Sequence, residues 1–227
     1  VRARWLEPGY AYFRISAFQG DTGLEFRRQW QALQSSAGDI KTKGILVDLR
    51  SNPGGLINAA VEVADEFLSD VPVVSTKGRN ALSDTRYFAK SGEQVPGLPV
   101  VVLIDAGSAS ASEILAGALQ DNKRATIVGS RSFGKGSVQN IFRLDNGDAF
   151  KLTTALYYTP DGRSIQGGGI EPDVLFSSNT KASVIESKLP KHIKATTPKR
   201  VDSEEGVVLT GDAFINQALA VLQQRKR

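Results

Sequence analysis

The sequence contains no cysteine and no methionine in 227 residues, and it has one histidine. The absence of cysteine excludes disulfide bonds, thiolate catalysis and cysteine-bound zinc, and it is compatible with a reducing or an oxidising compartment. The histidine, His192, lies in the polar stretch LPKHIK. A Ser-His-Asp triad needs a buried, oriented imidazole, so we do not expect His192 to be a catalytic base. A serine hydrolase built on this sequence would need a lysine or a carboxylate instead.

Long apolar runs and a strong net charge are also missing. No run reaches the length of about 18 apolar residues that crosses a membrane. The net charge of +4 comes from 28 basic and 24 acidic residues. The basic residues concentrate late in the chain, where no aromatic residue lies between Lys181 and Arg200. Nucleic-acid-binding surfaces interleave the two kinds, so we interpret this segment as a solvated surface and expect no nucleic-acid partner.

Apolar runs typical of strands alternate with amphipathic segments typical of helices. Strands are expected over residues 10–18, 44–49, 71–75, 85–88, 100–104, 125–129, 141–144, 149–158 and 174–176. Helices are expected around residues 26–33, 56–68 and 114–119. The sequence DNGD between two of the late strands is a strong hairpin signal. This order of elements predicts an α/β core with crossover connections.

The chain turns polar after the last of these strands. Residues 177–211 are polar, and residues 213–224 form an amphipathic pattern that packs on the core or pairs with a partner chain. We therefore expect an α/β core over residues 1–176 and a polar linker with a C-terminal amphipathic helix over residues 177–227. Because the chain begins at Val1, we expect it to be a processed or cloned fragment.

The stretch VVVLIDAGSASASEILAGALQDN, residues 100–122, joins a buried strand, a turn of small residues and a helix. Such a turn can expose a hydroxyl at the start of a helix, beside free backbone N–H groups. It therefore suits a serine nucleophile. The residue types leave Ser108, Ser110 and Ser112 as competing candidates, and each of them could instead be only a helix cap.

Three glycine- or serine-rich turns follow three strands, over residues 50–55, 105–112 and 130–139. The ends of neighbouring strands in an open α/β sheet line one crevice, so we expect these turns to meet. We interpret Asp105 as structural. Glu113 is placed to interact with the N-terminus of its helix, where negative charge is favoured.

Five sequence blocks, in order, resemble the carboxyl-terminal processing peptidases. These are also called tail-specific proteases, a serine-peptidase family with a Ser-Lys dyad. The blocks are RSNPGG, GSASASEI, GKGSVQ, TPDGRSI and GIEPD, and the resemblance covers roughly residues 10–174. It implies a crotonase-like or ClpP-like α/β protease core, which here carries a C-terminal helical extension.

The resemblance assigns Ser110 as the nucleophile, Lys135 as the general base and Gln139 as the group that orients the lysine. A lysine accepts a serine proton only when it is neutral, and Phe133 and Val138 could keep water away from the amine. In a helix or in a strand, Gln139 would lie on the same side as Lys135. Its amide would fix the amine without adding a negative charge.

The resemblance also implies an oxyanion hole made of backbone N–H groups. One comes from Ala111, the residue after the nucleophile. The other comes from a glycine of the NPGG turn, and we favour Gly55 over Gly54. No metal and no cofactor is expected.

The implied function is an ATP-independent serine endopeptidase that cleaves proteins at or near their C-termini through an acyl-enzyme on Ser110. Its partners would be protein or peptide substrates with exposed C-termini, and the resemblance leaves open a homo-oligomer through the C-terminal helix and an activating adaptor protein. Family members carry an export signal, so a periplasmic or otherwise exported location is expected. They also carry a PDZ domain before this core. Residues 1–8 then resemble the connection out of a missing PDZ domain, and a fragment without it is expected to be weakly active or inactive.

Two other classes of function compete with a peptidase. One is a non-catalytic binding or scaffold module on the same fold, in which Lys135→Ala would leave function intact. The other is a crotonase-like acyl-CoA enzyme, which also uses backbone oxyanion donors and would bind an acyl-CoA. The combination of Ser110, Lys135 and Gln139 favours the peptidase.

Overall fold

The computed structural model describes residues 1–79, 84–176 and 213–225. The strands are β1 (Arg2–Glu7), β2 (Tyr10–Arg14), β3 (Gly44–Asp48), β4 (Pro72–Gly78), β5 (Thr85–Phe88), β6 (Val100–Ile104), β7 (Thr126–Gly129), β8 (Ser137–Arg143), β9 (Ala149–Tyr158) and β10 (Val174–Leu175). The helices are α1 (Thr22–Ser36), α2 (Ile57–Asp65), α3 (Ala111–Asp121) and α4 (Ala213–Gln224). His192 and the expected linker lie outside the described residues, so the predicted division of the chain at residue 176 stays a prediction.

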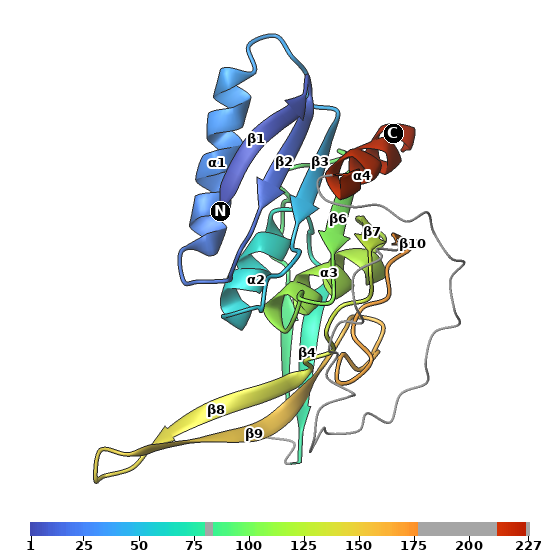
Figure 1. The fold of residues 1–227 in the computed structure, drawn as a ribbon. Helices are drawn as coiled ribbons and strands as arrows, with labels where there is room; N and C mark the ends of the chain where they lie inside the picture. The colour runs from blue at the N-terminus through green and yellow to red at the C-terminus, as the bar shows by residue number, and fades with distance from the viewer. Residues whose placement is uncertain (80–83, 177–212, 226–227) are drawn as a thin grey trace.

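The main sheet has six strands in the order β1-β2-β3-β6-β7-β10. Strands β2, β3, β6, β7 and β10 are parallel to one another, and β1 at the edge is antiparallel to β2. Parallel neighbours need crossover connections, which α1 supplies between β2 and β3 and α3 supplies between β6 and β7. The predicted α/β core with crossovers is confirmed (Figure 1).

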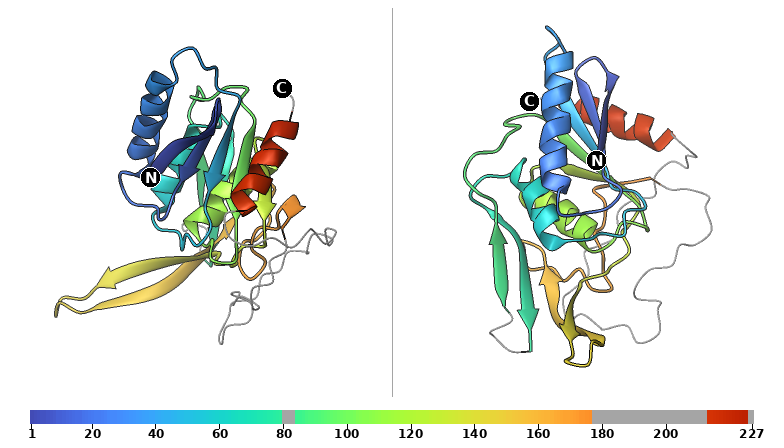
Figure 2. Two further views of the ribbon diagram at one scale, coloured as in Figure 1. Left: turned by 45° about the horizontal axis from the view of Figure 1, so that its top comes forward. Right: turned by 90° about the vertical axis from the view of Figure 1, so that its left-hand side faces the viewer.

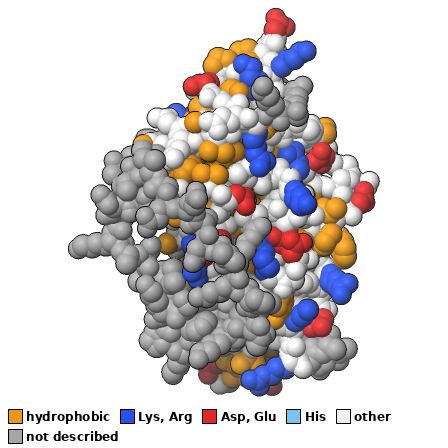
Figure 3. Space-filling view, turned by 90° about the vertical axis from the view of Figure 1, so that its right-hand side faces the viewer, with side chains coloured by type: hydrophobic (Ala, Val, Ile, Leu, Met, Phe, Trp, Pro, Cys, Tyr) orange, Lys and Arg blue, Asp and Glu red, His pale blue; other side chains and the backbone are white. Residues whose placement is uncertain are grey.

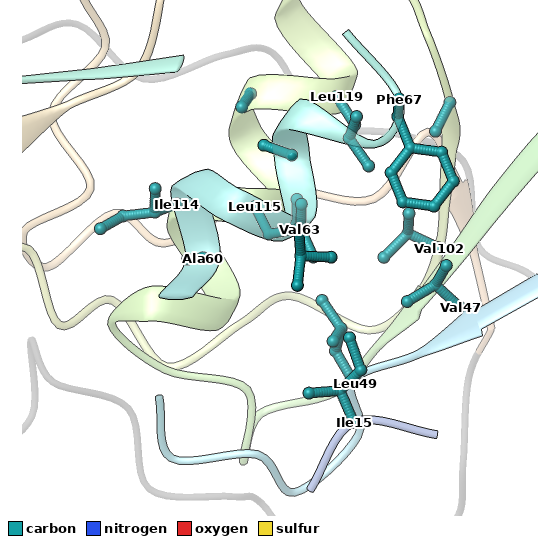
Figure 4. Close-up of a cluster of buried hydrophobic side chains, with 14 of the residues drawn as sticks. Ile15, Val47, Leu49, Ala60, Val63, Phe67, Val102, Ile114, Leu115 and Leu119 are labelled. Atoms are coloured by element: carbon teal, nitrogen blue, oxygen red, sulfur yellow. The ribbon is translucent and has the colours of Figure 1, made fainter. Parts of the chain in front are cut away.

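The main sheet is covered on both faces, and the alternation along β6 shows how. Val100, Val102 and Ile104 belong to the cluster that contains the buried residues of α1, α2 and α3. Val101 and Leu103 belong to a second cluster, on the face covered by α4. Successive side chains of a strand point to opposite faces, so this continuous apolar run fits a strand that helices cover on both faces. Figure 4 shows part of the first cluster, where α2 and α3 pack over the sheet.

Helix α4 packs on the core of its own chain. Its buried residues Ile215, Ala218, Leu219 and Leu222 join the second cluster, and the helix contacts β3, β6 and β7. The fit is close, because a Cβ added to Gly44 would lie 2.9 Å from Leu222 Cδ1. Of the two arrangements that the sequence left open for this helix, the structure shows packing on the core.

A second sheet of four strands, in the order β5-β4-β9-β8, lies beside the main one. Strands β8 and β9 continue as a long hairpin that projects away from the body of the protein (Figures 1 and 2). The predicted turn at DNGD is confirmed, with the Leu144 N–H donating to Asp148 O at 2.8 Å. Strand β8 begins at Ser137, four residues before the expected start, because its pairing with β9 extends back to that residue.

Two elements at the N-terminal end differ from expectation. Residues 1–8 were expected to be a connection, whereas Arg2–Glu7 form β1 and pair with β2. The first predicted strand ends at Arg14 rather than at residue 18. The chain leaves the sheet there because Phe18 pairs with Gly55 instead, its N–H donating to Gly54 O at 2.9 Å.

None of the helices that the structure describes is long and apolar enough to cross a membrane. On the face shown in Figure 3, Lys and Arg side chains are interspersed with Asp and Glu. The described side chains visible on that face therefore form no continuous basic stripe.

We predict that Leu222→Ala lowers the free energy of unfolding by about 2–5 kcal/mol, because it removes buried contacts between α4 and the sheet and leaves a cavity. Leu222 is 1% exposed. Leu24, which is 48% exposed on α1, is the matched control, and Leu24→Ala should change stability by less than about 0.5 kcal/mol. Urea unfolding of both variants measures the difference. Equal, small effects would show that α4 does not pack on this sheet in solution.

Candidate active site

The three glycine- or serine-rich turns follow β3, β6 and β7, which are neighbours in the sheet. Asp105, at the end of β6, ties the first two turns together. Its Oδ1 accepts hydrogen bonds from Ser51 N at 2.7 Å and from Gly107 N at 2.9 Å. The approach leaves no room for a side chain at Gly107, where a Cβ would lie 2.8 Å from Ser51 Cα. These contacts fit the structural role that the sequence suggested for Asp105.

The three candidate serines occupy different environments. Ser108 is fully buried and donates its hydroxyl to Leu49 O at 2.8 Å. Ser112 is also fully buried, and its hydroxyl donates to Asn52 O at 3.0 Å. Ser110 is partly exposed. Ser110 is therefore the serine of the three that an outside ligand can reach, a distinction that the residue types alone did not make.

The backbone of Ser110 is held in a strained conformation directly before α3. Its φ of 56° and ψ of −112° lie in a region that residues other than glycine rarely adopt. The Ser110 N–H donates to Glu113 Oε2 at 2.8 Å, and the Glu113 N–H donates to Ser110 O at 2.9 Å. Strain of this kind persists only where the surroundings over-determine it, and it concentrates at functional sites.

Two backbone N–H groups beside Ser110 are available to an oxyanion. The main chain of Gly54 packs against the start of α3, since a Cβ there would lie 2.7 Å from Ser110 Cβ and 2.9 Å from Ala111 N. The Gly54 N–H is occupied, because it donates to Asn52 Oδ1 at 2.9 Å. Across the parts of the chain that the structure describes, the N–H groups of Gly55 and Ala111 donate to no protein acceptor. The Gly55 N–H is thus free where the Gly54 N–H is not, and the role of Gly55 in an oxyanion hole stays a prediction.

Lys135 is half-buried in the turn after β7, and its backbone is fixed on both sides. Its own N–H donates to Glu113 Oε2 at 2.9 Å, and the Gly134 N–H donates to Glu113 Oε1 at 2.6 Å. On the other side, the Gly136 N–H donates to the buried Gln166 Oε1 at 3.0 Å. A Cβ at Gly136 would lie 2.2 Å from Gln166 N, so this position requires glycine.

The side chains of the predicted catalytic group are less closely joined than their backbones. Gln139 lies in β8 opposite Thr153 and is exposed. Within the described residues, no hydrogen bond joins the Lys135 amine to the Ser110 hydroxyl or to Gln139. The Ser110 and Lys135 amides nevertheless bond to the same Glu113 oxygen, so the two residues are adjacent. The orienting role of Gln139 stays a prediction.

Glu113 joins the nucleophile turn to the lysine turn. It is fully buried and accepts four hydrogen bonds, two on Oε2 from the Ser110 and Lys135 amides and two on Oε1 from Gly134 N and from Ser132 Oγ at 2.5 Å. Burial raises the pKa of Glu113 to about 7, although these hydrogen bonds pull the pKa down. The sequence indicated only a role at the helix N-terminus for this residue.

Gln166 is the second residue whose part in the site the sequence did not reveal. Its only signal was its place in the glycine-rich stretch QGGG. The structure holds this stretch against the lysine turn, with the Gly167 N–H donating to Gly134 O at 2.8 Å. Arg131 fixes the same stretch by donating to Gly168 O at 2.8 Å and to Gly167 O at 3.1 Å.

The arrangement suits acyl transfer. A hydroxyl on a strained turn, two free backbone donors and an amine on the adjoining turn are the parts that nucleophilic catalysis on a carbonyl requires. The described ranges contain no group of three or more His, Asp or Glu residues that could hold a metal ion.

Known proteins share this sequence pattern. The family model of Peptidase family S41 matches residues 9–176. The carboxy-terminal-processing protease of Bartonella bacilliformis is 47% identical over 189 residues, which are 83% of this chain and 42% of that protein. The carboxyl-terminal-processing protease of Synechocystis sp. is 38% identical over 211 residues, which are 92% of this chain and 46% of that protein. The chain therefore spans less than half the length of these curated relatives.

A solved structure shares the fold. The photosystem II D1 C-terminal processing protease superposes with a TM-score of 0.66 and 35% sequence identity, over 73% of this chain and 42% of that one. The mixed α/β fold is thus that of an S41 protease, which confirms the predicted crotonase-like or ClpP-like core.

We predict that Glu113 makes the stability of the protein depend on pH. The pKa of Glu113 in the folded protein, about 7, lies above the ordinary value of 4.5, so the folded state holds the proton more tightly than the unfolded chain does. The free energy of unfolding should therefore fall as pH rises from about 4.5 to about 7, and the loss should persist above pH 7. Urea unfolding at a series of pH values measures this fall.

Glu113→Gln is the control, because it carries no titratable proton. Whatever its absolute stability, this component of the pH dependence should be missing from the variant. Parallel curves of unfolding free energy against pH for the two proteins would contradict the prediction.

Proposed function

The chain belongs to peptidase family S41, and from that premise we propose that it forms the core of an ATP-independent serine endopeptidase that cleaves proteins at or near their C-termini. The observation that carries this proposal is the shared Glu113 carboxylate, which places the amide of Ser110 beside the amide of Lys135. The reachable Ser110 hydroxyl and the free N–H groups of Gly55 and Ala111 support it.

In the proposed reaction, Ser110 Oγ attacks the carbonyl carbon of the scissile peptide bond, and the neutral Lys135 amine takes the hydroxyl proton. The carbonyl oxygen becomes an oxyanion that accepts hydrogen bonds from the Gly55 and Ala111 N–H groups. Each such donor stabilises the transition state by about 2.7–4 kcal/mol. Lys135 then gives the proton to the leaving amine, and water releases the acyl group from Ser110 by the same steps in reverse roles.

The reaction requires Lys135 Nζ to come within about 2.6–3.2 Å of Ser110 Oγ. We propose that the lysine side chain makes this closure and that the turn stays in place, since Glu113 and Gln166 hold the backbone around Lys135. The proposed role of Gln139, orienting the amine, belongs to this closed state.

The proposal extends to partners and location. The substrates would be proteins or peptides with exposed C-termini. The apolar face of α4 is buried against its own sheet, which leaves its exposed face for a contact between copies or with an adaptor. The family resemblance supports a periplasmic or otherwise exported location, which fractionation of cells that express the full-length protein would test.

We predict that Ser110→Ala in the full-length protein lowers the turnover of an unfolded protein substrate by at least about 10³-fold, because it removes the nucleophile. Ser108→Ala and Ser112→Ala are the matched controls. Their hydroxyls hold backbone carbonyls, so these variants should lose stability and keep turnover per folded molecule. If Ser110→Ala retained full turnover, the nucleophile assignment would fail.

We predict that Lys135→Ala prevents acylation of Ser110 by an active-site-directed fluorophosphonate, with a rate loss of at least about 10³-fold. Lys135→Arg should not restore the rate, because a guanidinium is always protonated and cannot accept the serine proton. Mass spectrometry of the labelled protein measures the rate. If Lys135→Ala were labelled at an unchanged rate, the Ser-Lys dyad would be ruled out. If that variant also kept its biological function, a non-catalytic scaffold would be favoured.

Calorimetry with an acyl-CoA should show no binding, which separates the peptidase from an acyl-CoA enzyme.

A further inference from the structure

The hairpin of β8 and β9 exposes apolar side chains far from the core. Phe142, Leu144, Phe150 and Leu152 are 40%, 46%, 46% and 51% exposed. The rings of Phe142 and Phe150 stack with their centroids 5.2 Å apart. Figure 2 shows the hairpin projecting from the body, with no other drawn element covering its outer part.

The register of the hairpin gathers these side chains on one face. Phe142 is opposite Phe150, and Leu152 is opposite Asn140, two residues along β8 from Phe142. Positions two apart in a strand share a face. Leu144 follows β8 directly and continues the pairing, since its N–H donates to Asp148 O at 2.8 Å, so it extends the same row. We call these four apolar residues the apolar face of the hairpin. The opposite face carries Ile141, Arg143 and Lys151, since Ile141 is opposite Lys151.

A two-stranded hairpin with an apolar face is marginally stable alone in water, and contiguous exposed apolar patches mark interaction sites. A second copy of the chain is a poor occupant. Four large side chains that are each about half exposed offer roughly 400 Å² of surface, whereas a stable interface buries about 800 Å² on each partner. The face suits a narrower ligand, such as a single extended polypeptide.

The position of the hairpin supports this choice. β8 begins two residues after Lys135 and, among the strands that the structure describes, lies at the edge of its sheet with β9 as its one partner. The outer edge of β8 has backbone groups that no described strand pairs with, which suits an added strand, as in recognition by β-augmentation. Phe142 lies five residues beyond the start of β8, about 17 Å along the strand. The apolar face thus lies farther along the strand that begins beside the lysine turn.

We propose that the apolar face of the hairpin binds unfolded substrate polypeptide, in extended form and with apolar side chains at alternate positions, on its way to Ser110. This inference rests on the proposed function, because it supplies the substrate class of the same site. The site would take segments exposed by unfolding, in which apolar residues are available. A folded protein would present no such segment to the face.

Binding can be tested without catalysis in the full-length Ser110→Ala protein. The probe is a fluorescent 16-residue peptide of alternating Leu and Thr with an amidated C-terminus, so that recognition of a free C-terminus does not contribute. Fluorescence anisotropy gives its Kd. Adding Phe142→Ser and Phe150→Ser should weaken binding by at least about tenfold, because two aromatic contacts are lost.

Ile141→Ser in the same background is the matched control, since Ile141 is 68% exposed on the opposite face. It should leave the Kd within about twofold. A peptide of alternating Ser and Thr should bind at least about tenfold more weakly than the Leu peptide. Thermal unfolding of each variant checks that the exposed substitutions leave the fold intact.

Three outcomes would overturn the inference. The Phe142→Ser, Phe150→Ser protein could bind the Leu peptide as tightly as its parent, or Ile141→Ser could weaken binding equally. Analytical ultracentrifugation could also show a dimer that the two Phe substitutions abolish, which would make a second copy the occupant. Fluorophosphonate labelling of the wild-type protein tests the proposed function separately, so failure of the hairpin site and failure of the peptidase are distinguishable.

Discussion

A buried carboxylate is the contact on which the site depends. The carboxylate of Glu113 lies at the junction of the nucleophile turn and the lysine turn, where four hydrogen-bond donors converge on its two oxygens. Burying an isolated carboxylate is costly, and donors that satisfy its lone pairs offset that cost. The raised pKa of Glu113 shows that the balance is close near neutral pH. The relative position of Ser110 and Lys135 therefore rests on a group whose charge is sensitive to its surroundings.

The other contacts of the site serve the same end by ordinary packing and hydrogen bonding. Buried hydroxyls at Ser108 and Ser112 hold the turn after β3 against the turn after β6. Close approaches at Gly54 and Gly136 bring main chain against main chain, where any side chain would collide. The strained backbone conformation of Ser110 persists because its closely packed neighbours cannot relax around it. The frame holds the backbones firmly, while within the described residues no hydrogen bond joins the Lys135 amine to Ser110 or Gln139.

Much of this could be predicted from the sequence. The pure apolar run of β6 and the periodic face of α1, with Phe26, Trp30 and Leu33 buried, gave correct elements because burial imposes local patterns. The sequence predicts a connection over residues 1–8, whereas residues 2–7 form a strand, because that strand depends on pairing with β2. The start of β8 was missed for the same reason: the small and polar residues at its beginning are extended because they pair with β9.

The sequence by itself determined the order of strands and helices from β2 onward, the three turns and the residue types able to do acyl transfer, because these follow from periodicity, turn chemistry and spacing along the chain. Only the tertiary structure decided which serine is reachable, which glycine N–H is free and that Glu113 and Gln166 hold the lysine turn. Those facts depend on contacts between residues far apart in the chain, such as Gly136 with Gln166. The spacing of residues along the sequence does not show which distant groups will come into contact, because those contacts form only when the sheet assembles and the turns pack together.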